Sequence, residues 1–335
     1  MRFGRFSLWC GIALLCIMLL TVTQAHVPIT TGDNEAIETA THIHDPLKSW
    51  AVYAELREGE GGVANYFEFE LEQGQRLRLS LFTPRESAFT PGLVVMGPGI
   101  EPHGTVPAFV TVPPGLDARV VEGQRPDRGS YEPFTPSALY ELAELDTTVT
   151  AAGTYYVAVY EPTNGGRYGL AVGYREEFSP VEWIRVPLDV IGVHRWEGQS
   201  VAVILAPMLV VVIIGLALLF WRRRTLGSPG WLGSLAGLLY IGSGGITLTQ
   251  MGIALSMVPI TAAVVVTLFF ALIPIIVGML LLRLALRVHA PVAPKVRVAL
   301  AILGVIGIVI WAGLVIGPIL ALLTSVLPGA SAENQ

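Results

Sequence analysis

The sequence predicts an all-β sandwich ectodomain joined to an α-helical transmembrane bundle of four helices. Short runs that alternate apolar and polar residues precede about residue 178, and long charge-free stretches follow it. Of the 335 residues, 53% are hydrophobic and only 14% are charged, which is far more apolar than a soluble protein of this size. A lipid bilayer must therefore solvate part of the chain.

Residues 1–25 predict a signal peptide. Arg2 and Arg5 give a basic start, residues 8–20 form an apolar core, and small residues precede a cleavage site before His26. The alternative is an uncleaved anchor helix, which the short apolar core disfavours. Both cysteines of the chain lie in this segment, so a cleaved protein would have no thiol for a disulfide or for cysteine catalysis.

Residues 26–178 predict an antiparallel β-sandwich. Period-two runs occur at residues 66–71, 75–82, 154–160 and 167–172, with glycine-containing turn signals between them. The wider segment from His26 to Gln199 contains 25 acidic and 12 basic residues, a net charge of −13 with histidine neutral. Such a surface repels nucleic acid, so we expect no nucleic-acid partner.

The same strands carry a resemblance to a known family. A run and two pairs of motifs carry it in succession: Ser49 to Leu56, then Asn65-Tyr66-Phe67-Glu68-Phe69 followed by Glu72-Gln73-Gly74-Gln75-Arg76-Leu77, and later Ala152-Gly153-Thr154-Tyr155-Tyr156-Val157 followed by Gly166-Arg167-Tyr168-Gly169-Leu170. Over about residues 35–175 the chain resembles the bacterial and archaeal pre-peptidase C-terminal domain. The resemblance implies a β-sandwich fold and an extracellular location, and it implies no reaction.

Between about Pro84 and Pro136 the chain departs from that family pattern. Proline and glycine recur so often that we expect an irregular insertion without long elements. Aromatic residues are scattered through this insertion: Phe89, Phe109, Tyr131 and Phe134. They either form a binding surface on the loops or pin the loops onto the sheet.

Residues 179–199 predict an interfacial connector. Trp183 and Trp196 alternate there with charged residues, a composition that suits the headgroup layer of a membrane. Four apolar spans follow within residues 200–325, at about 201–221, 231–255, 260–282 and 298–322, each long enough to cross about 30 Å of hydrocarbon as a helix.

The positive charges predict the orientation of these spans. Arg222, Arg223 and Arg224 follow the first span, and four basic residues between Arg283 and Arg297 follow the third, so both loops should be cytoplasmic. With four crossings, the sandwich and the C-terminal tail at residues 326–335 are both extracytoplasmic.

The spans have no ionisable residue in their cores, which disfavours a transporter. The most polar positions, including Ser243 and Gln250, lie in the second span, where the glycines of residues 242–245 indicate close helix packing or, less readily, a pathway. We find no hydrolase or phosphate-binding motif and predict that the protein is not an enzyme. Glu141, Glu144 and Asp146 form an acidic cluster that favours a solvated edge, with a calcium site as the alternative.

Three histidines form the one candidate metal site. Cleavage before His26 would expose both its α-amine and its ring, and His42 and His44 should project from one face of an extended strand. Imidazole and amine nitrogens suit copper. The alternative is that three surface histidines merely lie near the start of the mature chain.

The sequence thus predicts a non-enzymatic, membrane-anchored surface protein whose sandwich binds a partner protein, a glycan or an envelope component, alone or as a subunit of a membrane complex. One alternative is an extracytoplasmic copper-binding or copper-handling membrane subunit. A second alternative is a transporter component. Apart from copper in the first alternative, we expect no cofactor.

Overall fold

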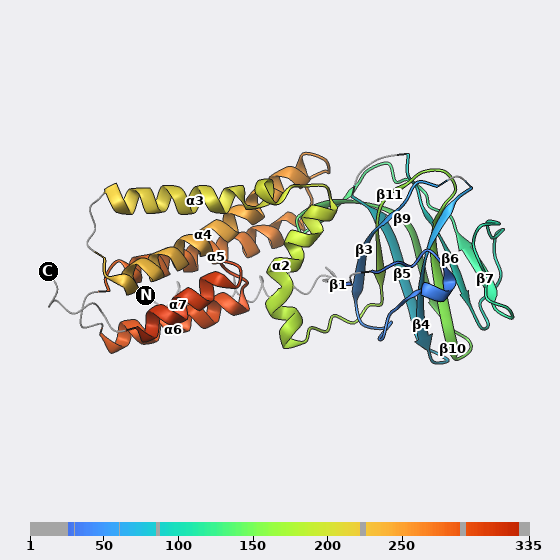
Figure 1. Ribbon diagram of the computed structural model, residues 1–335, viewed down its shortest axis with the longest axis horizontal. Coiled ribbons are helices and arrows are strands. Elements are labelled where there is room, and N and C mark those ends of the chain that lie inside the picture. The colour runs from blue at the N-terminus through green and yellow to red at the C-terminus, as the bar shows by residue number, and fades with distance from the viewer. Residues whose placement is uncertain are drawn as a thin grey trace, which may run out of the picture.

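The computed structural model describes residues 26–29, 31–59, 61–84, 88–221, 226–288 and 293–327. Figure 1 shows two parts, a β-rich domain at one end and a group of helices at the other. The predicted signal peptide, the arginines at 222–224 and the last eight residues of the chain lie outside the described residues.

The β-rich domain contains two mixed sheets. The first has the strand order β1-β3-β11-β5-β9-β8 and the second has the order β2-β4-β10-β6-β7. The strands are β1 (Val27–Ile29), β2 (Thr41–His42), β3 (Trp50–Leu56), β4 (Val63–Leu71), β5 (Arg76–Thr83), β6 (Gly92–Gly97), β7 (Asp117–Val121), β8 (Ser130–Glu132), β9 (Ser137–Thr148), β10 (Gly153–Glu161) and β11 (Gly166–Val172).

The two sheets pack face to face around a shared apolar core. Every second residue of β5, from Leu77 to Leu81, is fully buried, as the alternation in the sequence predicts. These leucines join one cluster with Phe67 and Phe69 of β4 and with Val157 of β10 in the other sheet. Burial of each such side chain stabilises the fold by about 1.5–3 kcal/mol relative to exposure.

Two features of the sheets differ from the prediction. The sandwich is not wholly antiparallel, because β1 pairs with β3 and β2 pairs with β4 in parallel. About twenty residues separate β1 from β3 and β2 from β4, which is long enough for the crossover that a parallel pair requires. The segment from Pro84 to Pro136 also contains β6, β7 and β8, because its prolines and glycines bound the strands rather than interrupt them.

Six helices follow among the described residues: α2 (Pro180–Trp196), α3 (Val201–Trp221), α4 (Ser228–Leu255), α5 (Val264–Ala285), α6 (Pro294–Val309) and α7 (Ile316–Val326). Of these, α3, α4 and α5 are long and apolar enough to cross a membrane. The central helix α4 contacts α3, α5 and α7. Its glycines permit this packing, because a Cβ on Gly242 would meet Met208 of α3 and one on Gly244 would meet Ala271 of α5.

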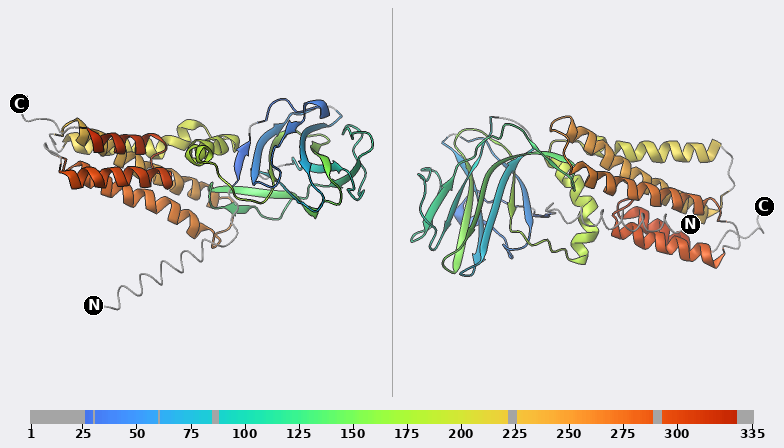
Figure 2. Two further views of the ribbon diagram at one scale, coloured as in Figure 1. Left: turned by 90° about the horizontal axis from the view of Figure 1, so that it is seen from below. Right: turned by 180° about the vertical axis from the view of Figure 1, so that it is seen from behind.

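The predicted fourth span at 298–322 is not one helix, so the four-helix bundle is not confirmed. It divides into α6 and α7, which lie antiparallel as a hairpin (Figures 1 and 2) with Gly304 against Leu322. The turn contains Gly313 at φ +66°, which favours glycine. Tyr240 of α4 occupies the space that a side chain at Gly313 would need, and its hydroxyl donates to the carbonyl of Leu303 at 3.2 Å.

Helix α2 lies across the ends of the membrane helices that face the sandwich (Figure 1). Ser179 caps its N-terminus and Glu182 completes the capping box while also pairing with Lys48 of the sandwich at 2.7 Å. At its other end, Trp196 Nε1 donates to the carbonyl of Ala54 at 3.0 Å. The connector is therefore a helix that is bonded to the sandwich at both ends.

Candidate functional site

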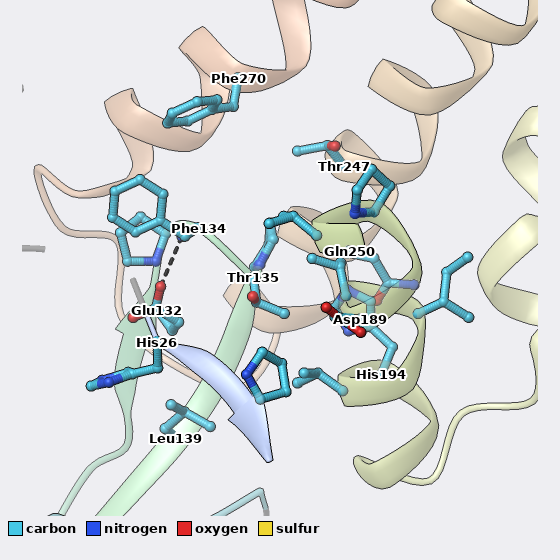
Figure 3. A pocket seen from close by; sticks show the side chains of 18 of the residues that line it. His26, Glu132, Phe134, Thr135, Leu139, Asp189, His194, Thr247, Gln250 and Phe270 are labelled. Carbon is cyan, nitrogen blue, oxygen red and sulfur yellow. Dashed lines mark hydrogen bonds between the residues drawn. The ribbon is translucent and has the colours of Figure 1, made fainter. Parts of the chain in front are cut away.

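A cavity of about 460 Å³ lies between the sandwich and the membrane helices. Its walls are the outer face of the first sheet, the β8–β9 hairpin, α2, and the adjacent ends of the membrane helices (Figure 3). Cavities of this size at the junction of two structural units are typical of sites for small molecules. The cavity therefore joins the two parts of the chain that the sequence predicts separately.

Polar and apolar groups are distributed unevenly around the cavity. The sandwich and α2 contribute most of its ionisable side chains: His26, Arg78, Glu132, Glu141, Glu144, Asp189 and His194. The membrane helices and the α6–α7 turn contribute mainly apolar side chains: Ile204, Ile246, Ala263, Phe270, Pro274, Ile310, Trp311 and Leu314. Ser243, Thr247 and Gln250 of α4 lie among these apolar groups.

The β8–β9 hairpin docks on the membrane helices and forms one wall of the cavity. Tyr131, which is 7% exposed, packs against Ala254 of α4 and Val264 of α5. Its hydroxyl lies 2.7 Å from Thr267 Oγ1, which donates to the carbonyl of Pro133 at 2.8 Å. Tyr131 thus pins its loop onto membrane helices, and not onto the sheet as one sequence interpretation expects.

Glu132 lies at the hairpin tip with its carboxylate held by the backbone. Its Oε1 accepts from the amide of Phe134 at 2.9 Å (Figure 3), and Thr135 donates a second backbone hydrogen bond. Burial raises the pKa of Glu132 to about 7, although both backbone bonds favour the ionised form, and the nearby carboxylate of Glu141 raises it further. Near neutral pH this carboxyl group is therefore divided between its protonated and ionised forms.

His194 lies on the opposite wall, on α2. The side chain is 1% exposed, and its Nδ1 lies 2.8 Å from Glu197 Oε2. Its Nε2 has no hydrogen-bond partner among the residues that the structure describes. A buried polar atom without a partner costs about 1–3 kcal/mol, which makes His194 the strongest single indication of a ligand.

Hydrogen bonds connect Glu197 to the membrane helices. Gln199 donates from Nε2 to Glu197 Oε2 at 3.3 Å. The side-chain amides of Gln199 and Gln250 exchange two hydrogen bonds of 2.8 Å each, which join the start of α3 to α4. A polar chain therefore runs from the cavity wall on α2 to the second membrane helix.

Two further acidic groups face the cavity. Burial raises the pKa of Asp189 on α2, and Arg185, with an N···O distance of 3.7 Å, only partly opposes this effect. Glu144 pairs with Arg78 at 3.5 Å. Glu141 and Glu144 both line the cavity and are both exposed, which agrees with the solvated edge that the sequence favours for them.

The structure does not bring the three predicted copper ligands together. His42 and His44 do share a face of the second sheet, with ring centroids 4.7 Å apart, and Glu68 lies 3.4 Å from His42. His26 lies beside the first sheet, where its Nδ1 is 2.6 Å from Ser49 Oγ. Burial, aided by Arg78, lowers the pKa of His26 to about 4. Within the described ranges, no three His, Cys, Asp or Glu side chains are grouped to hold a metal ion.

Sequence reasoning missed Glu132, Asp189 and His194 as site residues. Glu132 lies far along the chain from Asp189 and His194, which share α2, and none of the three belongs to a recognisable motif. One local signal was available: Glu132 stands between two of the aromatic residues in the insertion, Tyr131 and Phe134. A charge enclosed by aromatic side chains is seldom a solvated surface group.

Comparisons with known proteins add no information about the site. No protein-family model matches the chain, and no curated protein gives a significant match. The resemblance to the pre-peptidase C-terminal domain therefore gains no support beyond the two packed sheets.

Proposed function

We propose that this chain is a non-enzymatic, membrane-anchored surface protein that binds an amphiphilic component of the cell envelope in the cavity between its sandwich and its membrane helices. The observation that carries this proposal is the division of the cavity lining. Ionisable groups come from the sandwich and α2, and mainly apolar groups come from the membrane helices. A molecule with a polar head and an apolar body matches such a lining.

The position of the cavity supports an envelope ligand. Helix α2 carries an exposed apolar stripe, Val181, Ile184 and Leu188, at helical spacing. An amphipathic helix of this kind lies in the interface of a bilayer, where its apolar side is buried among lipids. The cavity beside α2 is therefore at the depth where the headgroups of membrane amphiphiles are found.

We further infer the orientation of the chain in the membrane. Cleavage before His26 and cytoplasmic arginine-rich loops place the sandwich outside the cell. The hairpin of α6 and α7 returns to the end of the bundle where α3 joins α4 (Figure 1). On this basis we assign the C-terminal tail to the cytoplasmic side, whereas four crossings predict it outside.

The two alternatives have less support. Copper binding is favoured only by the neighbouring rings of His42 and His44, because His26 lies beside the other sheet. A transporter role has little support from α3, α4 and α5, whose one Asp, Glu, Lys, Arg or His is Arg283 near the end of α5.

Co-purification of the ligand tests the proposal. The full chain is extracted in dodecyl maltoside, and the amphiphiles that remain bound after size exclusion are identified by mass spectrometry. Ala263 lines the cavity, and its neighbour Ala262 is exposed, which gives a matched pair of variants. Ala263→Phe should lose a specific amphiphile that the wild type and Ala262→Phe retain. The same amphiphile content in all three proteins would refute a ligand in this cavity.

A further inference from the structure

Carboxyl groups outnumber Lys and Arg on the polar side of the cavity. Glu132 on the hairpin and Asp189 on α2 face each other from opposite walls (Figure 3). Glu141, whose charge acts on Glu132, also lines the cavity. Arg78 is the one Lys or Arg among the lining residues that the structure describes, and it pairs with Glu144. Asp189 has a partner as well, Arg185 at 3.7 Å, so four carboxyl groups line this space against two arginines within ion-pair distance of them.

His194 adds another acceptor to the same wall when its ring is neutral and Glu197 is ionised. The carboxylate of Glu197 accepts a hydrogen bond, so the ring nitrogen 2.8 Å away must donate. In the neutral ring, Nε2 then carries a lone pair, and this atom has no partner among the described residues. A ligand with a hydrogen-bond donor would satisfy it, whereas an anionic ligand would not.

The size and lining of the cavity indicate an organic cation and not a metal ion. A volume of about 460 Å³ far exceeds that of one ion, and the acceptors are spread over opposite walls. No three of the described carboxyl or imidazole groups are grouped to coordinate one ion. Aromatic rings of Phe134, Phe270 and Trp311 also line the space, and ring faces attract organic cations.

We infer that the ligand is an amphiphile with an ammonium headgroup, held between Glu132, Asp189 and Nε2 of His194, with its apolar chain against the membrane helices. This inference rests on the proposed function, because it names the chemical class of the ligand in the same cavity. An ammonium group supplies the positive charge that the carboxylates attract, and a primary amine adds donors for the acceptors that it reaches. An apolar chain accounts for the remaining volume.

Matched probes that differ only in the headgroup test this inference. The full chain in dodecyl maltoside at pH 8 is titrated with dodecylammonium and with dodecanoate, and the dissociation constant is taken from the rise in unfolding temperature. Butylammonium serves as the short-chain probe and separates a lipid headgroup from a free amine. Dodecylammonium should bind at least about tenfold more tightly than either other probe, which corresponds to about 1.4 kcal/mol.

Variants separate the headgroup from the cavity itself. Glu132→Gln combined with Asp189→Asn keeps the shape of both side chains and should remove most of the preference for dodecylammonium. Glu101→Gln combined with Asp117→Asn makes the same charge change at exposed positions that do not line the cavity, and should leave the preference unchanged. Because the control variant is titrated with the same probes, it also corrects for the charge that the probe adds to the micelle.

The outcomes distinguish the two proposals. If both dodecyl probes bind equally and Ala263→Phe abolishes binding of both, the cavity holds amphiphiles but the ammonium inference is wrong. Equal affinity for butylammonium and dodecylammonium would overturn the assignment to an amphiphile. If Ala263→Phe leaves dodecylammonium binding intact, the ligand is not in this cavity and the proposed function fails with it.

Discussion

Substitution of Glu132 by glutamine should stabilise the protein at high pH and have little effect at low pH. Glutamine keeps the side-chain oxygen that accepts from the amide of Phe134, so the hairpin tip retains its hydrogen bond. It removes a carboxyl group whose ionised form is unfavourable in the folded state because of burial.

The magnitude follows from the pKa. Burial raises the pKa of Glu132 from 4.5 to about 7, and one pKa unit corresponds to about 1.4 kcal/mol. Between these values the unfolded chain binds fewer protons than the folded protein, so stability falls as the pH rises through this window and is constant above it. The cost of the ionised group is thus at most about 3 kcal/mol at pH 8 and below about 1 kcal/mol at pH 5.

Thermal unfolding of the full chain in dodecyl maltoside provides the measurement. At pH 8 the glutamine variant should unfold roughly 5–10 °C above the wild type, and at pH 5 the difference should shrink to a few degrees. Glu101→Gln, at an exposed position, should show no pH-dependent difference from the wild type. A Glu132→Gln variant that is less stable than the wild type at pH 8, or equally shifted at both pH values, would refute the buried carboxylate.

Three further predictions concern other parts of the chain. A cysteine at Ser228 and one at Ser331 should both resist a membrane-impermeant thiol reagent in intact cells; labelling at Ser331 alone would restore a fourth crossing. Tyr131→Phe should lower the stability of the full chain by about 1 kcal/mol but have no effect in residues 26–178 expressed alone, where the partner on α5 is absent. Any copper binding measured by titration of the purified protein should be lost when His42→Ala is combined with His44→Ala. One extra residue before the mature N-terminus should leave that binding unchanged. Weaker binding by the extended protein would instead implicate the N-terminus.

The sequence predicts those elements whose signal is local. The alternation in residues 75–82 corresponds to β5, and the charge-free stretches at 201–221, 231–255 and 260–282 correspond to α3, α4 and α5. In each case the burial of a residue follows from its immediate neighbours, through a period of two in a strand or an unbroken apolar run in a helix.

The elements that the sequence does not predict depend on distant partners. The break between α6 and α7 depends on Tyr240 of α4, which lies about seventy residues before Gly313 and fills the space beside it. The residues at 298–322 are apolar enough for a single span, so hydropathy alone does not predict the turn between α6 and α7. The signal for it lies in Gly307, Gly313 and Gly317, the three glycines that receive the tyrosine ring.

The cavity escapes sequence analysis for the same reason. Its walls come from the first sheet, the insertion, the connector helix, three membrane helices and the α6–α7 turn. Each of these segments has an ordinary composition when it is taken alone. The polar face of β5, with Arg78 and Ser80, looks like a solvent-facing surface in the sequence. It faces the cavity because the membrane helices lie over that side of the sheet.

The attachment of α2 has a consequence for how the sandwich meets its surroundings. Glu182 and Trp196 tie the helix to the sandwich, and the carbonyl of Trp183 accepts from Trp311 in the turn between α6 and α7 at 2.9 Å. A domain on a loose stalk would sample many tilts and would lose that freedom on meeting a partner. Here the tilt is set before any encounter, so the β7 edge, at the far end of the molecule in Figure 1, is presented at a constant height above the bilayer.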